Sequence, residues 1–345
     1  MEKLLVLTHV DESGEALTKA SLEAVAAGME MAGALEASVT IGIVGARTET
    51  AAQQVAGTAV RVLAVAGEAF AEARYASDAA ACEALCRAAE ATLVFAPASS
   101  RFNRVIPGVA YRLGGFSDTH VTAVAKGETV EATRWFYRQR VEAVLRRETR
   151  PWFLLLEAGT RAPWAGSGDA VRVETVAVEL PALRTKVTGV RAPRQGEQTI
   201  RPNAKILFVA GAGWTKKQAD GKVHAAEAEN LILDFLHVAG ASLGSSKSLV
   251  DQSGENQAVL GFLTHLNQIG QTGATPRHPK GLSTCCHGEE PHVVGWRFIT
   301  ERRAVSLDPN CGWARGKADV LYVADAFKVM AKVNALLADR KQASN

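Results

Sequence analysis

Cysteine is scarce in this chain, long apolar runs are missing, and neither sign of charge dominates. Five cysteines, an odd number among 345 residues, do not make a disulfide framework, so the sequence indicates a reducing compartment. No stretch approaches the ~18 apolar residues of a membrane span. Residues 1–10 lack the charged start and the long apolar centre of a secretory signal. These absences predict a cytoplasmic protein, or one of an organelle matrix, without membrane insertion.

The charge balance gives no indication of a nucleic-acid partner. Lys and Arg number 39 against 36 Asp and Glu, and a net charge of +3 is too small to attract a polyanion. Basic residues gather between residues 184 and 203, interleaved with glycine and proline but without aromatics. A nucleic-acid arm is the alternative there, but the composition favours a solvated linker between domains.

Patterns typical of substrate-converting enzymes are also missing. The chain has no nucleophile elbow, no phosphate-binding P-loop and no spaced pair of carboxylates, so we predict no catalytic residue. Cysteine and histidine do collect near the C-terminus, but adjacent cysteines rarely bind one ion and no C-x2-C pair is present, so we predict no metal site. The residues of this group are Cys285, Cys286, His287, His278, His292 and Cys311. Cys82 and Cys86, four apart on a predicted helix, are predicted to be core residues.

Short apolar runs alternate with helical patterns along the first half of the chain. Continuous apolar strands separated by helices are typical of a parallel sheet that is covered on both faces. The alternation in residues 171–180 predicts an antiparallel edge as well. Strands are predicted at residues 3–8, 39–44, 61–65, 92–96 and 152–156, one helix at 79–89, and another that begins near Leu17 and stops at Gly33.

A second unit of the same kind begins at residue 205. Residues 205–210 predict a strand, Gly211-Ala212-Gly213 its turn, and residues 225–239 a helix. At ~100–200 residues per domain, the length suggests two domains. We therefore predict an α/β fold of two doubly wound, Rossmann-like parallel-sheet domains. Their predicted limits are residues 1–183 and 204–345, joined by a linker at 184–203.

Small, flexible and hydroxylated residues are concentrated in the second unit, with one lysine and two histidines among them. Glycines let a backbone approach a ligand closely, and exposed amides with hydroxyls suit phosphates and the polar edge of a ring system. This stretch therefore predicts a bound cofactor of nucleotide type. It comprises Gly244-Ser245-Ser246-Lys247, Asp251, Gln268-Ile269-Gly270-Gln271-Thr272-Gly273, His287-Gly288 and Pro291-His292.

Together with the turn at residues 211–213 and with Ser306-Leu307-Asp308-Pro309, these segments resemble the α subunit of electron transfer flavoproteins. In that family the corresponding segments wrap one FAD, and the hexapeptide QIGQTG at residues 268–273 is the specific motif. Residues 94–118 resemble the family more weakly. The resemblance spans nearly the whole chain, weakly up to about Asn203 and strongly beyond it.

The resemblance implies that FAD is bound chiefly by the second domain. Thr272 would lie at the flavin N5 region, and His292 beside the C2 carbonyl, where a donor or cation favours one-electron steps. Lys247 replaces a family arginine, which keeps the charge but loses the planar fork. The implied cofactor-binding residues are Gly211, Gly213, Gly244, Ser245, Ser246, Lys247, Asp251, Gln268, Gly270, Gln271, Thr272, Gly273, His287, Gly288, His292, Ser306, Asp308 and Asp319.

The family also implies partners: a β-type subunit, a flavin dehydrogenase that donates electrons, and a quinone-linked acceptor. The chain would then be a redox-active electron-transfer subunit rather than a substrate-converting enzyme, with the linker at 184–203 as a candidate hinge. This sequence departs from the family at Gly213, at Lys247 and most of all at residues 285–290. A second hypothesis is therefore a subunit fixed in a complex with one dehydrogenase, for example one that oxidises an N-methylated amine.

Overall fold

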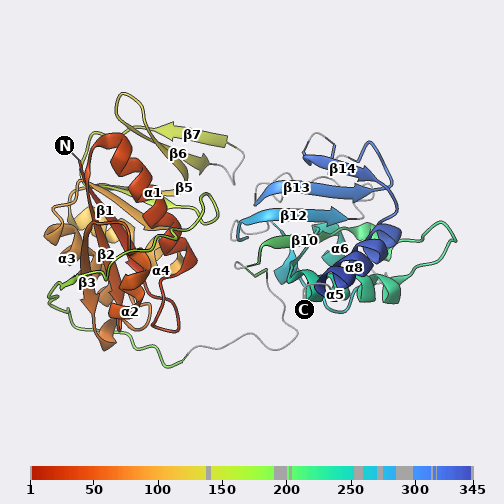
Figure 1. Cartoon of the computed structure of the whole chain (residues 1–345), viewed down its shortest axis with the longest axis horizontal. Coiled ribbons are helices and arrows are strands. Elements are labelled where there is room, and N and C mark those ends of the chain that lie inside the picture. Colours follow the sequence, from red (N-terminus) through yellow and green to blue (C-terminus); the bar gives the residue numbers. More distant parts are fainter. Residues whose placement is uncertain are drawn as a thin grey trace. The chain divides into compact units, whose positions relative to one another are not determined.

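The computed structural model divides into two compact units, Met1–Val190 and Arg191–Asn345. Each unit contains one sheet with helices packed on it, so the predicted α/β class is confirmed (Figure 1). The limits of the predicted linker, at residues 184 and 203, stay a prediction. The structure describes residues 2–136, 141–189, 200–201, 204–251, 259–269, 275–284, 298–311, 314–315 and 317–342.

The sheet of the first unit has nine strands within the described residues, in the order β7-β6-β5-β8-β4-β1-β2-β3-β9. In this order, every neighbouring pair from β5 to β9 is parallel, whereas β6 is antiparallel to both of its neighbours, β5 and β7. The strands are β1 (Lys3–His9), β2 (Ser38–Gly45), β3 (Arg61–Ala66), β4 (Leu93–Pro97), β5 (Phe116–Lys126), β6 (Val130–Phe136), β7 (Val141–Leu145), β8 (Trp152–Leu156) and β9 (Val173–Thr175).

Helices cover both faces of this sheet, which explains its continuous apolar strands. In β1, Leu4 and Val6 point into one buried cluster, with α1 (Lys19–Leu35) and α2 (Glu49–Ala52). Leu5 and Leu7 point into the other, with α3 (Tyr75–Ala88) and α4 (Ser100–Arg112). Successive side chains of a strand alternate between faces, so a strand buried on both faces is apolar throughout.

Helices α3 and α1 test two predictions, the burial of two cysteines and the position of a helix end. Cys82 and Cys86 are buried on α3 in the second cluster, which confirms them as core residues, and burial raises the pKa of both thiols. The predicted helix end at Gly33 is wrong, because α1 continues to Leu35 and ends at Glu36 with a left-handed φ of 53°. A single glycine lowers helix propensity by only ~1 kcal/mol, and packing overrides it.

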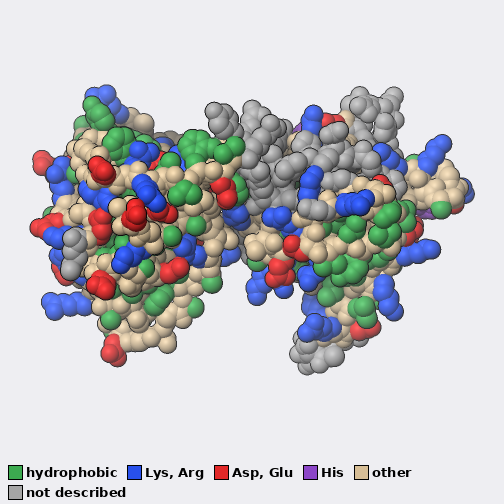
Figure 2. Space-filling view, turned by 90° about the horizontal axis from the view of Figure 1, so that it is seen from above, with side chains coloured by type: hydrophobic (Ala, Val, Ile, Leu, Met, Phe, Trp, Pro, Cys, Tyr) green, Lys and Arg blue, Asp and Glu red, His purple; other side chains and the backbone are tan. Residues whose placement is uncertain are grey.

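The first unit has an antiparallel edge, but the residues predicted to form it are wrong. The edge consists of β5, β6 and β7, whereas residues 171–180 contribute only β9, which pairs parallel with β3. Alternation reports that one face of a strand is solvated, and it does not report the direction of the neighbouring strand. Hydrophobic side chains reach the surface of this unit among Lys and Arg (Figure 2), and those of β7 include Val141 and Val144.

An irregularity in β5 places His120 against Glu157. The register between β5 and β8 shifts between Asp118 and Val121, and His120 has a left-handed φ of 59°. Its Nδ1 lies 2.6 Å from Glu157 Oε1. This hydrogen bond, assisted by the charge of Glu157, raises the pKa of the half-exposed His120.

We expect this pair to make stability fall with rising pH. Because the folded-state pKa of His120 is raised, its contribution is complete below the ordinary imidazole value of about 6.5 and is lost as the pH rises through the folded pKa. His120→Asn should remove this dependence, since asparagine tolerates the left-handed backbone. Urea unfolding of both proteins on either side of neutral pH measures it. Identical pH profiles would contradict the prediction.

The second unit has a five-stranded sheet within the described residues, all parallel, in the order β11-β10-β12-β13-β14. Helix α5 (Ala225–Ala239) has the predicted bounds and ends at Gly240 with φ 59°. It lies beside α8 (Ala326–Gln342) on one face of this sheet (Figure 1). The strands are β10 (Ile206–Ala210), β11 (Ser242–Ser245), β12 (His278–Thr284), β13 (Ile299–Ser306) and β14 (Val320–Val323). No helix of the described residues is long and apolar enough to cross a membrane.

Candidate cofactor site

The strand order of the second unit defines where a ligand would bind. From β10 the chain passes through α5 to β11 on one side, whereas β12, β13 and β14 follow on the other side of β10. The order therefore reverses between β10 and β12. In open α/β sheets, ligands bind outside the carboxyl ends of the strands at such a point.

Hydrogen bonds join the ends of three adjacent strands, β11, β10 and β12, at this edge. Gly211 N donates to Thr284 O at 2.9 Å, and Ser246 N donates to Ala210 O at 2.9 Å. The Trp214 indole, fully buried after β10, donates through Nε1 to Thr284 Oγ1 at 2.8 Å. The predicted residues Gly211, Gly213, Ser245 and Ser246 therefore follow or end neighbouring strands at one edge of the sheet.

Two buried polar groups at this edge have no hydrogen-bond partner among the residues that the structure describes. They are Ser245 Oγ and Gln268 Oε1, in residues that are 0% and 7% exposed. Their backbones pair as a parallel bridge, and Ile269 N donates to Ser245 O at 3.1 Å. An unsatisfied buried polar group costs about 1–3 kcal/mol. A ligand that supplied the missing partners would recover this energy, so the two atoms indicate a binding site.

Gly244 has a packing role that its sequence does not reveal. A Cβ at this position would lie 2.5 Å from Ile269 Cδ1, because the Ile269 side chain fills that space. Ile269 is buried and directly follows Gln268. The missing side chain thus lets the segment with Gln268 pack against β11. A cofactor contact of Gly244 stays a prediction.

Lys247 carries an accessible positive charge just beyond β11. It begins α6 (Lys247–Asp251), and its Nζ lies 3.4 Å from Asp251 Oδ2, with the two side chains 54% and 37% exposed. Asp251 Oδ1 lies 3.8 Å from His265 Nδ1. Exposed ion pairs of this kind contribute little. The ammonium group can therefore turn from Asp251 to a ligand at small cost.

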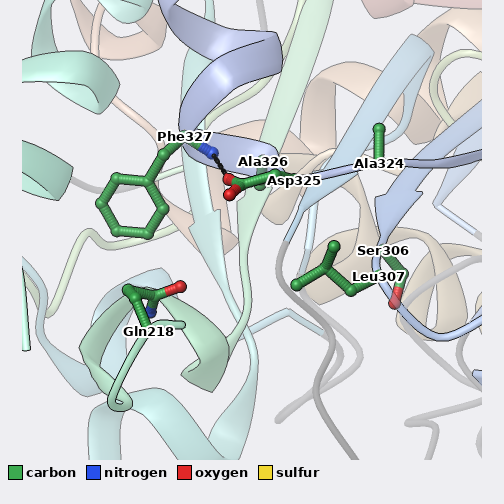
Figure 3. Close-up of a pocket in the computed structure, with 7 residues that line it drawn as sticks. All are labelled: Gln218, Ser306, Leu307, Ala324, Asp325, Ala326 and Phe327. Carbon is green, nitrogen blue, oxygen red and sulfur yellow. Dashed lines mark hydrogen bonds between the residues drawn. The ribbon is translucent and has the colours of Figure 1, made fainter. Parts of the chain in front are cut away.

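A hollow of about 230 Å³, counting space open to solvent, lies beyond β13 and β14. Ser306 Oγ accepts from Asp308 N at 3.2 Å, and Asp308 Oδ1 accepts from Asn310 N at 2.8 Å, so both residues shape the turn after β13. Figure 3 shows the lining side chains, which are Gln218, Ser306, Leu307, Ala324, Asp325, Ala326 and Phe327.

The structure separates Asp319 from the other predicted residues. Asp319 precedes β14, and its Oδ2 accepts from Arg302 N at 2.6 Å. Ser306 pairs with Val323, four residues further along, which corresponds to about 13 Å of strand. Asp325, which the sequence analysis missed, follows the carboxyl end of β14 and lines the hollow with Ser306. Its Oδ1 accepts from Phe327 N at 2.8 Å, and an aspartate between a strand and a helix is a helix-capping signal that could have drawn attention to it.

Several of the predicted cofactor-binding residues lie outside the part of the chain that the structure describes. Gly270, Gln271, Thr272, Gly273, His287, Gly288 and His292 lie outside the described residues, as do Cys285 and Cys286. Among the residues that are described, no group of three or more His, Cys, Asp or Glu could hold a metal ion. The contacts of the QIGQTG loop with a cofactor therefore remain predictions.

The fold and the site define a doubly wound domain with a ligand edge, and comparison with known proteins gives its family. Residues 6–183 match the family model described as the electron transfer flavoprotein domain. The chain is 24% identical over 244 residues to the electron transfer flavoprotein subunit alpha of Bradyrhizobium diazoefficiens, covering 71% of each chain. The chain therefore belongs to the electron transfer flavoprotein family, as a divergent α-type member, which confirms the resemblance seen in the sequence.

A solved structure also aligns with most of the chain. It is the crystal structure of the glycosyl transferase family 9 from Veillonella parvula DSM 2008, with 11% identity, 96% of this chain and 90% of that chain covered, and a TM-score of 0.23. A similarity at this level carries no argument about the fold or the function of the present chain.

Proposed function

We propose that this chain is the FAD-containing subunit of an electron carrier. Its family is one of electron transfer flavoproteins. The observation that carries the proposal is a pair of buried atoms, Ser245 Oγ and Gln268 Oε1, at the ligand edge of the second sheet, which find no partner within the described part of the chain. FAD has hydrogen-bond donors on its ring and its hydroxyls, and acceptors on its ring and its phosphates, and so has partners for both atoms.

The remaining groups of this edge match the rest of FAD. When bound, the flavin supplies the ability to take up and release electrons one at a time. Lys247, with its exposed ammonium group, would hold negative charge near the ring or the phosphates. The carboxylate of Asp325, beside Ser306, would accept hydrogen bonds from ribose hydroxyls. The hydrogen bonds between the strand ends fix the backbone at Gly211 and Ser246 before the ligand arrives.

The first unit offers a surface for a β-type subunit. Strand β7 ends the described sheet, and its Val141 and Val144 are 48% and 61% exposed. Phe136 at the end of β6 is 37% exposed. An edge strand with exposed apolar side chains favours pairing with another chain. We infer that this edge contributes to the contact with a β-type subunit.

Within the proposal, a flavin dehydrogenase donates the electrons and a quinone-linked protein accepts them. A subunit fixed in a complex with one dehydrogenase, for example for an N-methylated amine, is the second candidate. Co-purification separates the two, because a free αβ carrier that serves several dehydrogenases excludes permanent assembly.

The proposal predicts a bound flavin. The chain, co-expressed with a β-type subunit and incubated with FAD, should keep a flavin absorption spectrum through gel filtration. Anaerobic addition of a reductant should bleach that spectrum, and air should restore it. A complex that elutes without flavin after incubation with excess FAD would overturn the proposed function.

A further inference from the structure

Ile200 and Arg201 are attached to the amino-terminal edge of the second sheet, opposite the cofactor edge. Arg201 N donates to Ser242 Oγ at 2.7 Å, at the start of β11. Arg201 O lies 2.8 Å from Nε2 of His278, at the start of β12. The backbone of one residue is thus held by β11 and β12, the two strands that flank β10.

The side chains of this segment strengthen the attachment. The Arg201 guanidinium donates through Nη2 to the carbonyls of Ala241, at 2.5 Å, and Gly240, at 3.4 Å. These carbonyls lie just beyond the end of α5, where a cation is favoured by the helix dipole. Ile200 is 9% exposed and belongs to the apolar cluster that also contains Leu207 and Phe298. This cluster lies on the face of the sheet opposite α5 and α8.

Ser242 and His278, the hydrogen-bond partners of the Arg201 backbone, are both buried in the second unit. Ser242 is fully buried and His278 is 1% exposed. His278 N donates to Phe298 O at 2.8 Å, and its ring Nδ1 lies 2.9 Å from Pro276 O. A neutral imidazole can donate to one of its two carbonyl neighbours, and an imidazolium to both. The receiving surface is therefore preformed by the sheet.

We propose that Ile200 and Arg201 form a clasp that fixes the end of the linker to the second unit. Any rotation between the two units then takes place before residue 200, so the predicted hinge at 184–203 is shorter at its C-terminal end. The clasp itself follows from the contacts of Arg201. Its consequence for rotation rests on the proposed electron-carrier function.

Hydrogen–deuterium exchange of the full-length chain without flavin tests the clasp. The Arg201 amide should exchange at least about tenfold more slowly than an unprotected amide, and Ser242→Ala should remove about tenfold of that protection. Ser245→Ala, at the other end of the same strand, is the matched control and should leave the Arg201 amide unchanged. An unprotected Arg201 amide in the natural protein would overturn the proposal, as would equal protection in the Ser242→Ala variant.

A second variant keeps the test valid if Ser242→Ala disturbs the sheet. Residue 201 lies outside both sheets, and Arg201→Gln removes the guanidinium bonds to the carbonyls of Ala241 and Gly240. Hydrogen exchange of the amide of residue 201 should therefore also accelerate in this variant. FAD titration of both variants, with the β-type subunit present, separates the two proposals. Unchanged affinity with lost protection supports the clasp, whereas absence of binding in the natural protein contradicts only the proposed function. Unchanged protection in Arg201→Gln would count against the clasp.

Discussion

Ser245→Ala should weaken FAD binding about tenfold while leaving the flavin-free protein at least as stable as before. In the free protein the Ser245 hydroxyl is buried and no described residue pairs with it, and removing such a group relieves a cost of about 1–3 kcal/mol. In the complex the same hydroxyl would be paired with the ligand, so its loss removes roughly one hydrogen bond, and 1.4 kcal/mol corresponds to about tenfold in affinity. Most core substitutions lower stability, which makes the opposite sign distinctive.

Isothermal titration with FAD and urea unfolding of the flavin-free protein measure the two effects. Ser242→Ala is the matched control, because Ser242 lies three residues earlier on the same strand and its hydroxyl accepts from Arg201 N. That variant should lower stability and leave FAD affinity unchanged. A Ser245→Ala protein that is destabilised by more than about 1 kcal/mol and binds FAD normally would show that the hydroxyl faces no ligand.

Asp78→Ala should lower the stability of the first unit by about 3–5 kcal/mol, the usual effect of breaking a buried ion pair. Asp78 is fully buried in the first turn of α3, and Arg101 on α4 is 6% exposed. Arg101 donates to Asp78 Oδ2 through Nε at 3.0 Å and to Oδ1 through Nη2 at 2.6 Å. Asp78 Oδ2 also accepts from Arg74 N at 3.0 Å. Removal of the carboxylate leaves the Arg101 guanidinium charged and buried, with the Phe70 carbonyl as its one remaining acceptor among the described residues.

The double variant Asp78→Leu, Arg101→Met distinguishes an unpaired charge from a simple loss of packing. It should recover most of the lost stability, because both charges are then gone. Glu174→Ala is the control, since it breaks an exposed pair with Arg61 and should change little. Urea unfolding followed by circular dichroism and by tryptophan fluorescence measures all of them. A double variant no more stable than Asp78→Ala would contradict the electrostatic explanation.

The sequence alone was sufficient to predict features that depend on residues close together in the chain. The run Leu4 to Leu7 predicts a strand buried on both faces, and alternate side chains do enter two separate cores. The helix at residues 225–239 was predicted with its observed bounds, because its apolar spacing ends at a glycine that can adopt a left-handed φ. The family was also evident from sequence, since its motifs are short contiguous segments.

Only the tertiary structure decided which distant groups meet. It places Asp325 beside Ser306 at the hollow and Asp319 at the opposite end of β14, because the strand register determines which residues of β13 and β14 lie side by side. It shows that Ile269 fills the space over Gly244 and that Ser245 Oγ has no partner in the described ranges of the chain. The sequence by itself thus determined the α/β class and the family, since both depend on local patterns. Whether a polar group is satisfied, and which strand lies beside which, depends on residues far away in the chain, and the folded structure alone brings these together.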